Sequence, residues 1–249
     1  MPASELWLVR HGESIANIAA STAWEEGRET VDIDIRDADV PLSDAGEAQA
    51  RALGTWLAAA ALDGAPAATW SSPYVRARHT LELALEEAGL TLATRLDERL
   101  RDRELGVVDR LTRLGRERRY PEEEERRDHL GKYYYRPPAG ESWADVALRL
   151  RSVLRDIEEG VSGGSNGRVL VVAHDAVIML FVHLLTGNTE EELLAFAQEN
   201  TVHNASVTIL RRPAGERLWS LDVFSHTDHL RSVGAPVTEH GGETETQPR

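Results

Sequence analysis

Two short apolar runs constrain this chain more than any other feature. Leu6–Val9 reads Leu-Trp-Leu-Val, and Val169–Ala173 reads Val-Leu-Val-Val-Ala. Continuous runs rich in Val and Leu are typical of central strands that are covered on both faces. Arg10 and His11 follow the first run, and His174 follows the second. Because charged and polar side chains come directly after buried strands, both strand ends are candidate functional positions.

Other strand and helix patterns alternate with these two runs. The further candidate strands are 68–72, 91–94, 205–210 and 219–224. Helical patterns follow Ser43 as N-cap, run from the Ser72-Pro73 pair to Gly89, run from Trp143 to Gly160, and cover 176–185. Strands that alternate with helices predict an α/β fold, a three-layer αβα sandwich with a mostly parallel central sheet and helices on both faces.

The chain of 249 residues suits one α/β domain. We expect this domain to span residues 1–232. The segment 97–140 is dense in charge and breaks the alternation, which predicts an irregular or helical insert that covers the site. Residues 233–249 are polar and rich in Gly and Pro, which predicts a disordered tail.

Composition excludes several classes of function. The net charge of −14 argues against partners such as nucleic acid or an anionic membrane. With no cysteine, disulfides, thiolate zinc sites and a cysteine nucleophile are excluded. We find no apolar run long enough to span a membrane and no signal-peptide pattern, so we expect a cytoplasmic protein. A small anionic substrate stays compatible with this charge, since surface charges beyond roughly 8 Å are screened.

Four side chains are predicted to converge at one edge of the sheet. Parallel α/β sheets bind ligands at the carboxyl ends of their strands. Arg10, His11 and His174 lie at such ends, and Arg76 lies in the first turns of the helix after the strand 68–72. Paired guanidinium groups suit phosphate oxygens, and a neutral imidazole nitrogen can attack phosphorus. The pattern therefore indicates phosphoryl chemistry.

The segments that carry these residues, LVRHGES, SSPYVRARHT and VVAHD, resemble the signatures of the histidine phosphatase superfamily, which has the phosphoglycerate mutase-like fold. DADVPLSDAGEAQARALG is similar to the loop and helix that follow the first signature. The resemblance implies that His11 is the phosphorylated nucleophile and that Arg10, Arg76 and His174 complete the phosphate pocket. It also implies phosphate contacts from Asn17 and Ser14, although Ser14 is equally suited to cap a helix. With no metal-ligand spacing evident, we expect no metal and no cofactor.

The general acid has two candidates. By resemblance, a Glu four residues before a Gly protonates the leaving oxygen; here Asp102 stands at that position, before Gly106. Asp is one methylene shorter than Glu, and a carboxyl misplaced by about 1 Å can cost on the order of 10²-fold in rate. Glu104 lies two residues further on and faces the same side if the segment is extended. The four-residue spacing to Gly106 favours Asp102, and Glu104 remains the alternative.

Two other features concern the surroundings of the site. Asp175 replaces a glycine that is common after the second histidine, and we expect its side chain to point away from the pocket and cap the following helix. The aromatic and basic run before Gly140-Glu141-Ser142 resembles a substrate cover in broad-specificity acid phosphatases. Its candidate substrate contacts are Arg126, Arg127, Lys132, Tyr134 and Arg136.

The sequence thus predicts a metal-independent phosphomonoesterase that hydrolyses small phosphorylated metabolites through phosphohistidine. One alternative is a 2,3-bisphosphoglycerate-dependent phosphoglycerate mutase, for which Glu125–Arg127 is the one feature that could clamp phosphoglycerate. A second alternative is a non-catalytic phosphate-binding protein of the same fold. The physiological substrate and the oligomeric state stay open, with a homodimer as one option.

Overall fold

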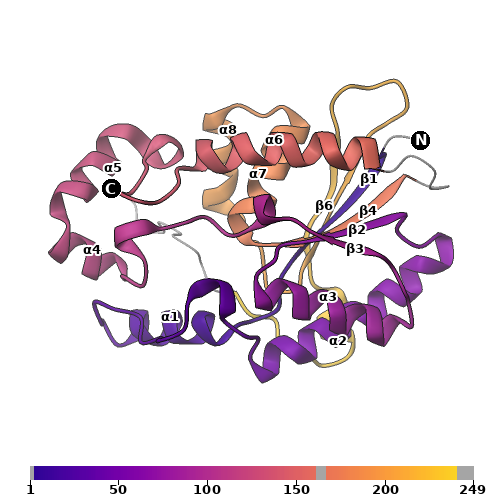
Figure 1. Cartoon of the computed structure of the whole chain (residues 1–249), viewed down its shortest axis with the longest axis horizontal. Coiled ribbons are helices and arrows are strands. Elements are labelled where there is room, and N and C mark those ends of the chain that lie inside the picture. The colour runs from indigo at the N-terminus through magenta and orange to yellow at the C-terminus, as the bar shows by residue number, and fades with distance from the viewer. Residues whose placement is uncertain (1–2, 161–166, 240–249) are drawn as a thin grey trace.

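A six-stranded mixed sheet forms the centre of the molecule in the computed structural model, which describes residues 3–160 and 167–239 (Figure 1). The strand order is β3-β2-β4-β1-β5-β6. The neighbours from β3 to β1 pair in parallel, and β5 and β6 add two antiparallel pairs at one edge. The strands are β1 (Glu5–Arg10), β2 (Ala68–Ser71), β3 (Thr94–Leu96), β4 (Arg168–Ala173), β5 (Val207–Arg211) and β6 (Ser220–His226).

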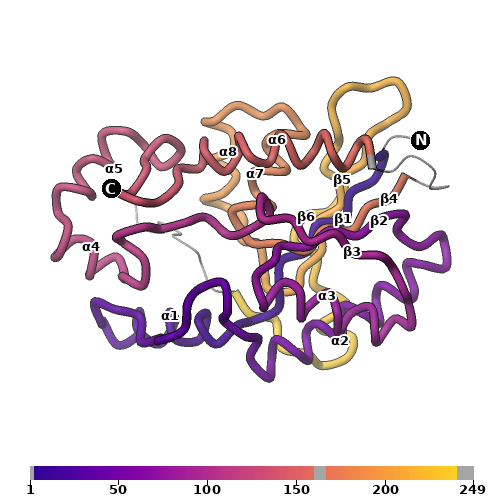
Figure 2. Tube along the Cα trace, viewed as in Figure 1, coloured from indigo at the N-terminus to yellow at the C-terminus, as the bar shows by residue number. Residues whose placement is uncertain are grey.

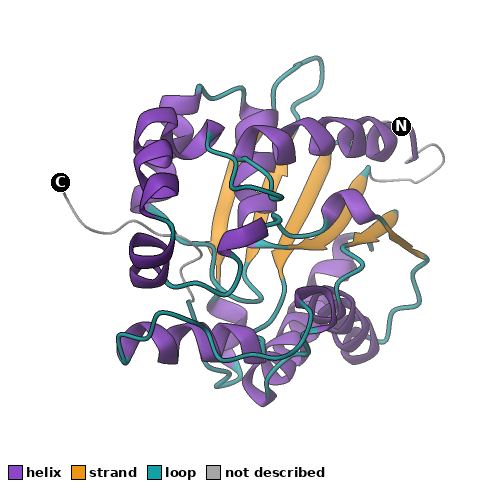
Figure 3. Ribbon diagram, turned by 60° about the vertical axis from the view of Figure 1, so that its left-hand side comes forward, coloured by secondary structure: helices purple, strands orange, loops and turns teal. Residues whose placement is uncertain are grey.

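Helices cover both faces of this sheet (Figure 3). The helices are α1 (Ile15–Glu25), α2 (Asp44–Ala60), α3 (Val75–Ala88), α4 (Arg113–Arg119), α5 (Pro121–Tyr134), α6 (Trp143–Gly160), α7 (Asp175–Thr186), α8 (Glu190–Glu199) and α9 (Asp228–Ser232). The core on one face holds side chains of α6, α7 and α8, and the core on the other face holds side chains of α2 and α3. In the described ranges, no helix combines the length and the apolar character that crossing a bilayer requires.

The side chains of β1 explain why it lies in the middle. Leu6 and Leu8 pack with α6 and α7, whereas Trp7 and Val9 pack with α2 and α3. Successive strand residues point to opposite faces, so a strand buried on both faces needs an unbroken apolar run. The predicted three-layer α/β sandwich with a mostly parallel sheet is confirmed.

Several local predictions are confirmed and two need correction. Ser43 caps α2 by accepting a hydrogen bond from the backbone N–H of Gly46 (3.0 Å), and Gly89 ends α3 in the left-handed conformation. The predicted strand 91–94 lies at Thr94–Leu96 instead. Ser72 does not cap α3, which begins at Val75 with Tyr74 as its N-cap residue.

The charged segment 97–140 is mostly helical. It contains α4 and α5, which lie together at one end of the molecule, with α1 nearby (Figure 1). The loop after α1 holds this segment, because Thr112 N donates to Glu29 O (3.1 Å) and Val31 N donates to Arg110 O (2.8 Å). Its role as a substrate cover stays a prediction.

The beginning of the predicted tail is ordered by specific contacts. Ala235 and Val237 pack against Leu230 of α9, which lies beside α2 (Figure 2). Gln49 Nε2 donates to Thr238 Oγ1 (2.8 Å), and Asn204 N donates to Thr238 O (3.1 Å). Residues 235–238 thus contact the domain, residues 240–249 lie outside the described residues, and disorder of the tail stays a prediction.

Helix α6 offers a direct test of the layered packing. Leu150 is fully buried between α6 and the sheet, whereas Leu148 on the same helix is 70 % exposed. Leu150→Ala should lower the free energy of unfolding by about 2–5 kcal/mol, because it removes buried methyl groups and leaves a cavity. Leu148→Ala is the matched control and should change it little. Denaturant unfolding measures both, and equal losses would contradict the assigned faces.

Candidate active site

The register of β1 on β4 brings the two histidines together. Arg10 pairs with Ala173, and the backbone N–H of His11 donates to the carbonyl of Ala173 (3.0 Å). His11 and His174 follow these two strand ends, and their rings lie 5.2 Å apart, centre to centre, at 62°. Both side chains are buried. The structure therefore places the two predicted histidines in one buried pocket.

The hydrogen bonds of His11 define its neutral form. Its Nδ1 lies 2.7 Å from the carbonyl oxygen of Gly12, which can only accept, so Nδ1 carries the proton. Nε2 then holds the lone pair, and it accepts a hydrogen bond from Nε of Arg76 (3.2 Å). Burial, followed by the charges of Arg76, His174 and Arg10, lowers the pKa of His11 well below its usual value. The ring is thus neutral, with the lone pair of Nε2 directed at the guanidinium group of Arg76.

The Arg76 side chain is buried, and each of its three nitrogens donates at least one hydrogen bond. Nη1 donates to the carbonyl and Oδ1 of Asp37 (2.6 and 2.9 Å), and Nη2 donates to Oδ2 of Asp37 and of Asp102 (3.3 and 3.1 Å). Burial alone would lower the pKa of Arg76, but these two carboxylates outweigh it and raise the pKa. Asp37 was not predicted, since its contact with Arg76 joins residues that are distant in the sequence.

His174 has a different set of neighbours. Its Nε2 lies 2.8 Å from Oγ of Ser72, and its Nδ1 lies 3.3 Å from Oδ2 of Asp102 without the alignment of a hydrogen bond. Burial, followed by the charges of Arg76 and Arg149, lowers the pKa of His174 well below its usual value. The hydroxyl of Ser72 therefore orients this histidine instead of capping α3.

Arg10 completes the cationic part of the pocket, and Asp175 lies close to it. Nη1 of Arg10 donates to the carbonyl of Val202 (2.5 Å). Burial lowers the pKa of Arg10, while the charges of Asp175 and Asp102 act in the opposite direction. Burial also raises the pKa of Asp175, and the charge of Arg10 opposes that rise. Asp175 lies in the first turn of α7, and the expected direction of its side chain stays a prediction.

The two candidate acids face different groups. The Asp102 side chain is 31 % exposed, and its Oδ2 contacts both Arg76 and His174, at 3.1 and 3.3 Å. The Glu104 side chain is 51 % exposed and lies 3.7 Å from Nε of Arg101. It also accepts a hydrogen bond from the hydroxyl of Tyr74 (3.2 Å). Of the two acids, Asp102 therefore contacts the predicted phosphate ligands Arg76 and His174, whereas Glu104 contacts Tyr74 and Arg101.

Glu141, whose side chain is 14 % exposed, holds the loop that carries Asp102. Glu141 accepts hydrogen bonds from Arg101 Nη2 (2.7 Å), from Arg149 Nε and Nη2 (3.0 Å each) and from the backbone of Glu104 (3.2 Å). Arg149, on α6, also donates to the carbonyl of Asp102 (3.1 Å). The loop from 99 to 104 is thereby fixed to a core helix, a connection that the sequence pattern did not predict.

Ser14 and Asn17 form the start of α1. Ser14 Oγ accepts from the backbone N–H of Asn17 (3.2 Å), and Asn17 Oδ1 accepts from the backbone N–H of Ser14 (3.0 Å). Asn204 Nδ2 lies 3.5 Å from the same oxygen and donates to the carbonyl of His11 (3.1 Å). This capping box uses the oxygen of Asn17, so a phosphate contact from Asn17 would have to come from its Nδ2. The predicted phosphate contacts of both residues stay predictions.

The candidate cover residues are spread over several environments. Arg127 is buried and lies 3.9 Å from Glu124, and Arg136 forms a two-bond ion pair with Asp145. Tyr134 is exposed and bonded to Glu190, and Arg126 is exposed on α5. Lys132 lies over the ring of Trp143 (4.9 Å), and its charge acts on Asp175. The charge of Lys132 thus acts on the residue that follows His174.

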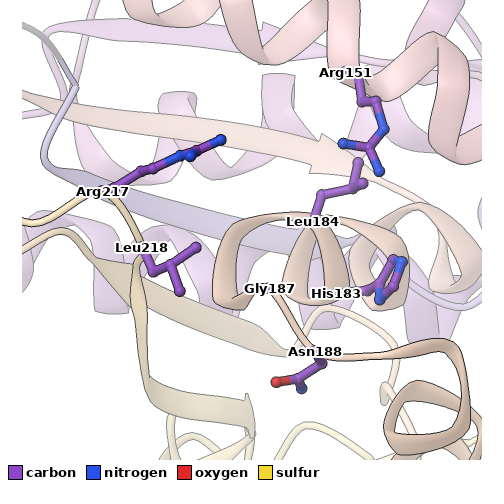
Figure 4. Close-up of a pocket in the computed structure, with 7 residues that line it drawn as sticks. All are labelled: Arg151, His183, Leu184, Gly187, Asn188, Arg217 and Leu218. Carbon is purple, nitrogen blue, oxygen red and sulfur yellow. The ribbon is translucent and has the colours of Figure 1, made fainter.

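Away from these residues, a cavity of about 370 Å³ lies at the C-terminal end of α7 (Figure 4). The residues that line it are Arg151, His183, Leu184, Gly187, Asn188, Arg217 and Leu218. None of the predicted catalytic side chains lines this cavity. Among the described residues, no group of three or more His, Asp or Glu side chains is arranged to hold a metal ion.

Comparison with known proteins agrees with this geometry. Residues 6–225 match the histidine phosphatase superfamily (branch 1). A 2,3-bisphosphoglycerate-dependent phosphoglycerate mutase 2 from Gloeobacter violaceus is 34 % identical, with 75 % of this chain and 79 % of that protein covered. A second such mutase, from Azorhizobium caulinodans, is 33 % identical, with 76 % of this chain and 84 % of that protein covered.

Solved structures with the same fold include phosphatases. A mycobacterial glucosyl-3-phosphoglycerate phosphatase in complex with VO3 has a TM-score of 0.69 and 27 % identity, with 90 % of this chain and 100 % of that chain covered. A protein described as mycobacterial hydrolase 1 has a TM-score of 0.72 and 26 % identity, with 90 % of this chain and 99 % of that chain covered.

The neutral state of His11 can be measured. Because burial and the charges of Arg76 and Arg10 disfavour the imidazolium, the His11 ring should remain neutral well below pH 6.5, the ordinary pKa of histidine. Its ¹⁵N chemical shifts should report a proton on Nδ1 at pH 6. The urea-unfolded protein supplies the reference titration. A midpoint for folded His11 at or above the unfolded value would contradict the assignment.

Proposed function

We propose that this chain, which belongs to the histidine phosphatase superfamily (branch 1), is a phosphomonoesterase that hydrolyses small phosphorylated metabolites through a phosphohistidine. One observation carries the proposal: the neutral, buried His11 directs its Nε2 lone pair at Arg76, and Arg76 also donates a hydrogen bond to the carboxyl group of Asp102. This arrangement supplies a nucleophile, a group that binds phosphate oxygens and an acid for the leaving group.

In the first step, Nε2 of His11 attacks phosphorus in line with the ester oxygen. The N–P bond forms as the P–O bond breaks, and protonated Asp102 gives its proton to the departing alcohol oxygen. The Nδ1–H bond to the Gly12 carbonyl stabilises the positive charge that develops on the ring. Arg10, Arg76 and His174 bind the equatorial oxygens, where negative charge accumulates.

In the second step, water replaces the alcohol. The Asp102 carboxylate takes a proton from the water as its oxygen attacks phosphorus, and the N–P bond breaks to release inorganic phosphate. Asp102 is then protonated again and His11 is neutral, so the cycle closes without another reactant. Glu104 remains the alternative acid; it contacts Tyr74 and Arg101, whereas Asp102 contacts Arg76 and His174 directly.

The mutase alternative rests on the two bacterial relatives with that name. A phosphoglycerate mutase has to bind the carboxylate of its substrate, and Glu125–Arg127 was the candidate for that role. Arg127 is buried next to Glu124, and Asp37 and Asp102 place negative charge at the phosphate pocket. These observations favour hydrolysis, as does the similarity to the mycobacterial phosphatase.

The proposal is tested by following the phosphoryl group. The purified protein should release inorganic phosphate from several small phosphomonoesters, and rapid acid-free quenching should trap phosphate bound to the protein. His11→Ala should abolish both signals because no other group forms the intermediate. Interconversion of 3- and 2-phosphoglycerate, even with added bisphosphate, should be weak. Fast bisphosphate-dependent interconversion with little phosphate release would establish the mutase alternative, and an absence of turnover would establish the non-catalytic one.

The identity of the acid is tested by varying the leaving group. General acid catalysis contributes about 10²–10⁴-fold, so Asp102→Asn should lose about that much activity with an alkyl phosphate. The loss should be much smaller with a nitrophenyl phosphate, whose leaving group needs no proton. Glu104→Gln is the matched control. If Glu104→Gln shows the leaving-group dependence and Asp102→Asn does not, the two roles are reversed.

A further inference from the structure

The donors of Arg76 are fully occupied by acceptors of this chain. An arginine carries one N–H on Nε and two on each Nη. Nε bonds His11, Nη1 bonds the carbonyl and Oδ1 of Asp37, and Nη2 bonds Oδ2 of Asp37 and Oδ2 of Asp102. A phosphoryl group on His11 can bind the Nη atoms only if one of these acceptors leaves.

The side chain of Asp37 is the acceptor that can leave most easily. It lies on a short 3₁₀ turn, Asp37–Asp39, and is 46 % exposed. Asp102, in contrast, is held through its carbonyl by Arg149 (3.1 Å) and through Oδ1 by the backbone of Arg103 (2.9 Å). Removal of the Asp37 carboxylate frees one N–H on Nη1 and one on Nη2, which is the paired arrangement that suits a phosphoryl group.

After this exchange, the carboxylate of Asp37 stays next to the pocket, since the Asp37 carbonyl still accepts from Arg76 (2.6 Å). The carboxylates of Asp102 and Asp109 are near enough to Asp37 for their charges to raise its pKa, whereas the charge of Arg76 lowers it. The neighbouring cations are already paired, Arg36 with Asp39 (2.8 Å) and Arg101 with Glu141 (2.7 Å). Carboxylates therefore border Arg76 on the side of Asp37.

We propose that Asp37 is a specificity-determining residue that selects phosphomonoesters with an uncharged or cationic alcohol part and disfavours those with a carboxylate or a second phosphate. This inference rests on the proposed phosphatase function. The dianionic phosphoryl group replaces the Asp37 carboxylate on Arg76, because it brings more negative charge to the guanidinium group. The displaced carboxylate then repels any second anionic group on the substrate.

Glycerol 1-phosphate and 3-phosphoglycerate form a matched pair for the test, because a CH₂OH group in the first is a carboxylate in the second. The wild-type protein should have the higher kcat/KM for glycerol 1-phosphate. Asp37→Asn should shift the ratio of the two kcat/KM values toward 3-phosphoglycerate by about tenfold, the order expected for removal of one nearby charge. Asp39→Asn, on the same turn but paired with exposed Arg36, should leave the ratio unchanged.

Phosphate binding gives a second readout that does not depend on turnover. Calorimetric titration with inorganic phosphate should show tighter binding to Asp37→Asn than to the wild type or to Asp39→Asn, because the competing carboxylate is gone. Asp37→Ser should behave in the same way if Asp37→Asn folds poorly. If no variant hydrolyses either ester, the phosphatase function fails, and the titration alone decides the role of Asp37. An unchanged ratio, or phosphate binding that is unchanged or weaker, overturns the proposal.

Discussion

The parallel register of β1 on β4 is the constraint on which the rest of the site depends. It sets Arg10 beside Ala173, so that His11 and His174 follow at the same level of the sheet. A slip by one residue would exchange the faces of β1, placing Leu6 and Leu8 where Trp7 and Val9 pack. The two different cores on the two faces of the sheet thus specify the geometry of the phosphate pocket.

Burial of charge is the second constraint, and carbonyl and carboxylate acceptors around the buried arginines satisfy it. Isolated buried ions are very costly, so each guanidinium group in the pocket has carbonyl or carboxylate acceptors. Glu141 and Arg149 extend this network from the pocket to α6, whose other side lies in the core. The position of the candidate acid therefore depends on how firmly α6 packs against the sheet.

Features determined by short stretches of sequence could be predicted, whereas features that depend on distant partners could not. The strands β1 and β4, the Ser43 cap and the glycine at the end of α3 each follow from a local pattern. The contact of Asp37 with Arg76 and the pairing of Ser72 with His174 join residues far apart in the chain, so no local pattern reveals them. The substrate-cover role of Arg127 and Arg136 comes from a resemblance and stays a prediction; their ion pairs with Glu124 and Asp145 join residues within the same part of the fold. Helices α1 and α8 were missed, although each begins with a capping box, because no apolar stripe was recognised there.

Side chains link residues 236–238 to the loop that carries His11. Gln49 bonds Pro236 and Thr238 through its amide nitrogen (3.0 and 2.8 Å) and the backbone of Glu13 through its oxygen (2.8 Å). Asn204 accepts a hydrogen bond from Thr238 Oγ1 through its Oδ1 (3.2 Å) and donates through its Nδ2 to the carbonyl of His11 (3.1 Å). A protein shortened at Ser232 would keep every side chain of the predicted phosphate site. It would still lose the hydrogen bonds that Gln49 and Asn204 make to Pro236 and Thr238. An affinity tag or a truncation at this end of the chain can therefore affect His11, which lies more than two hundred positions earlier.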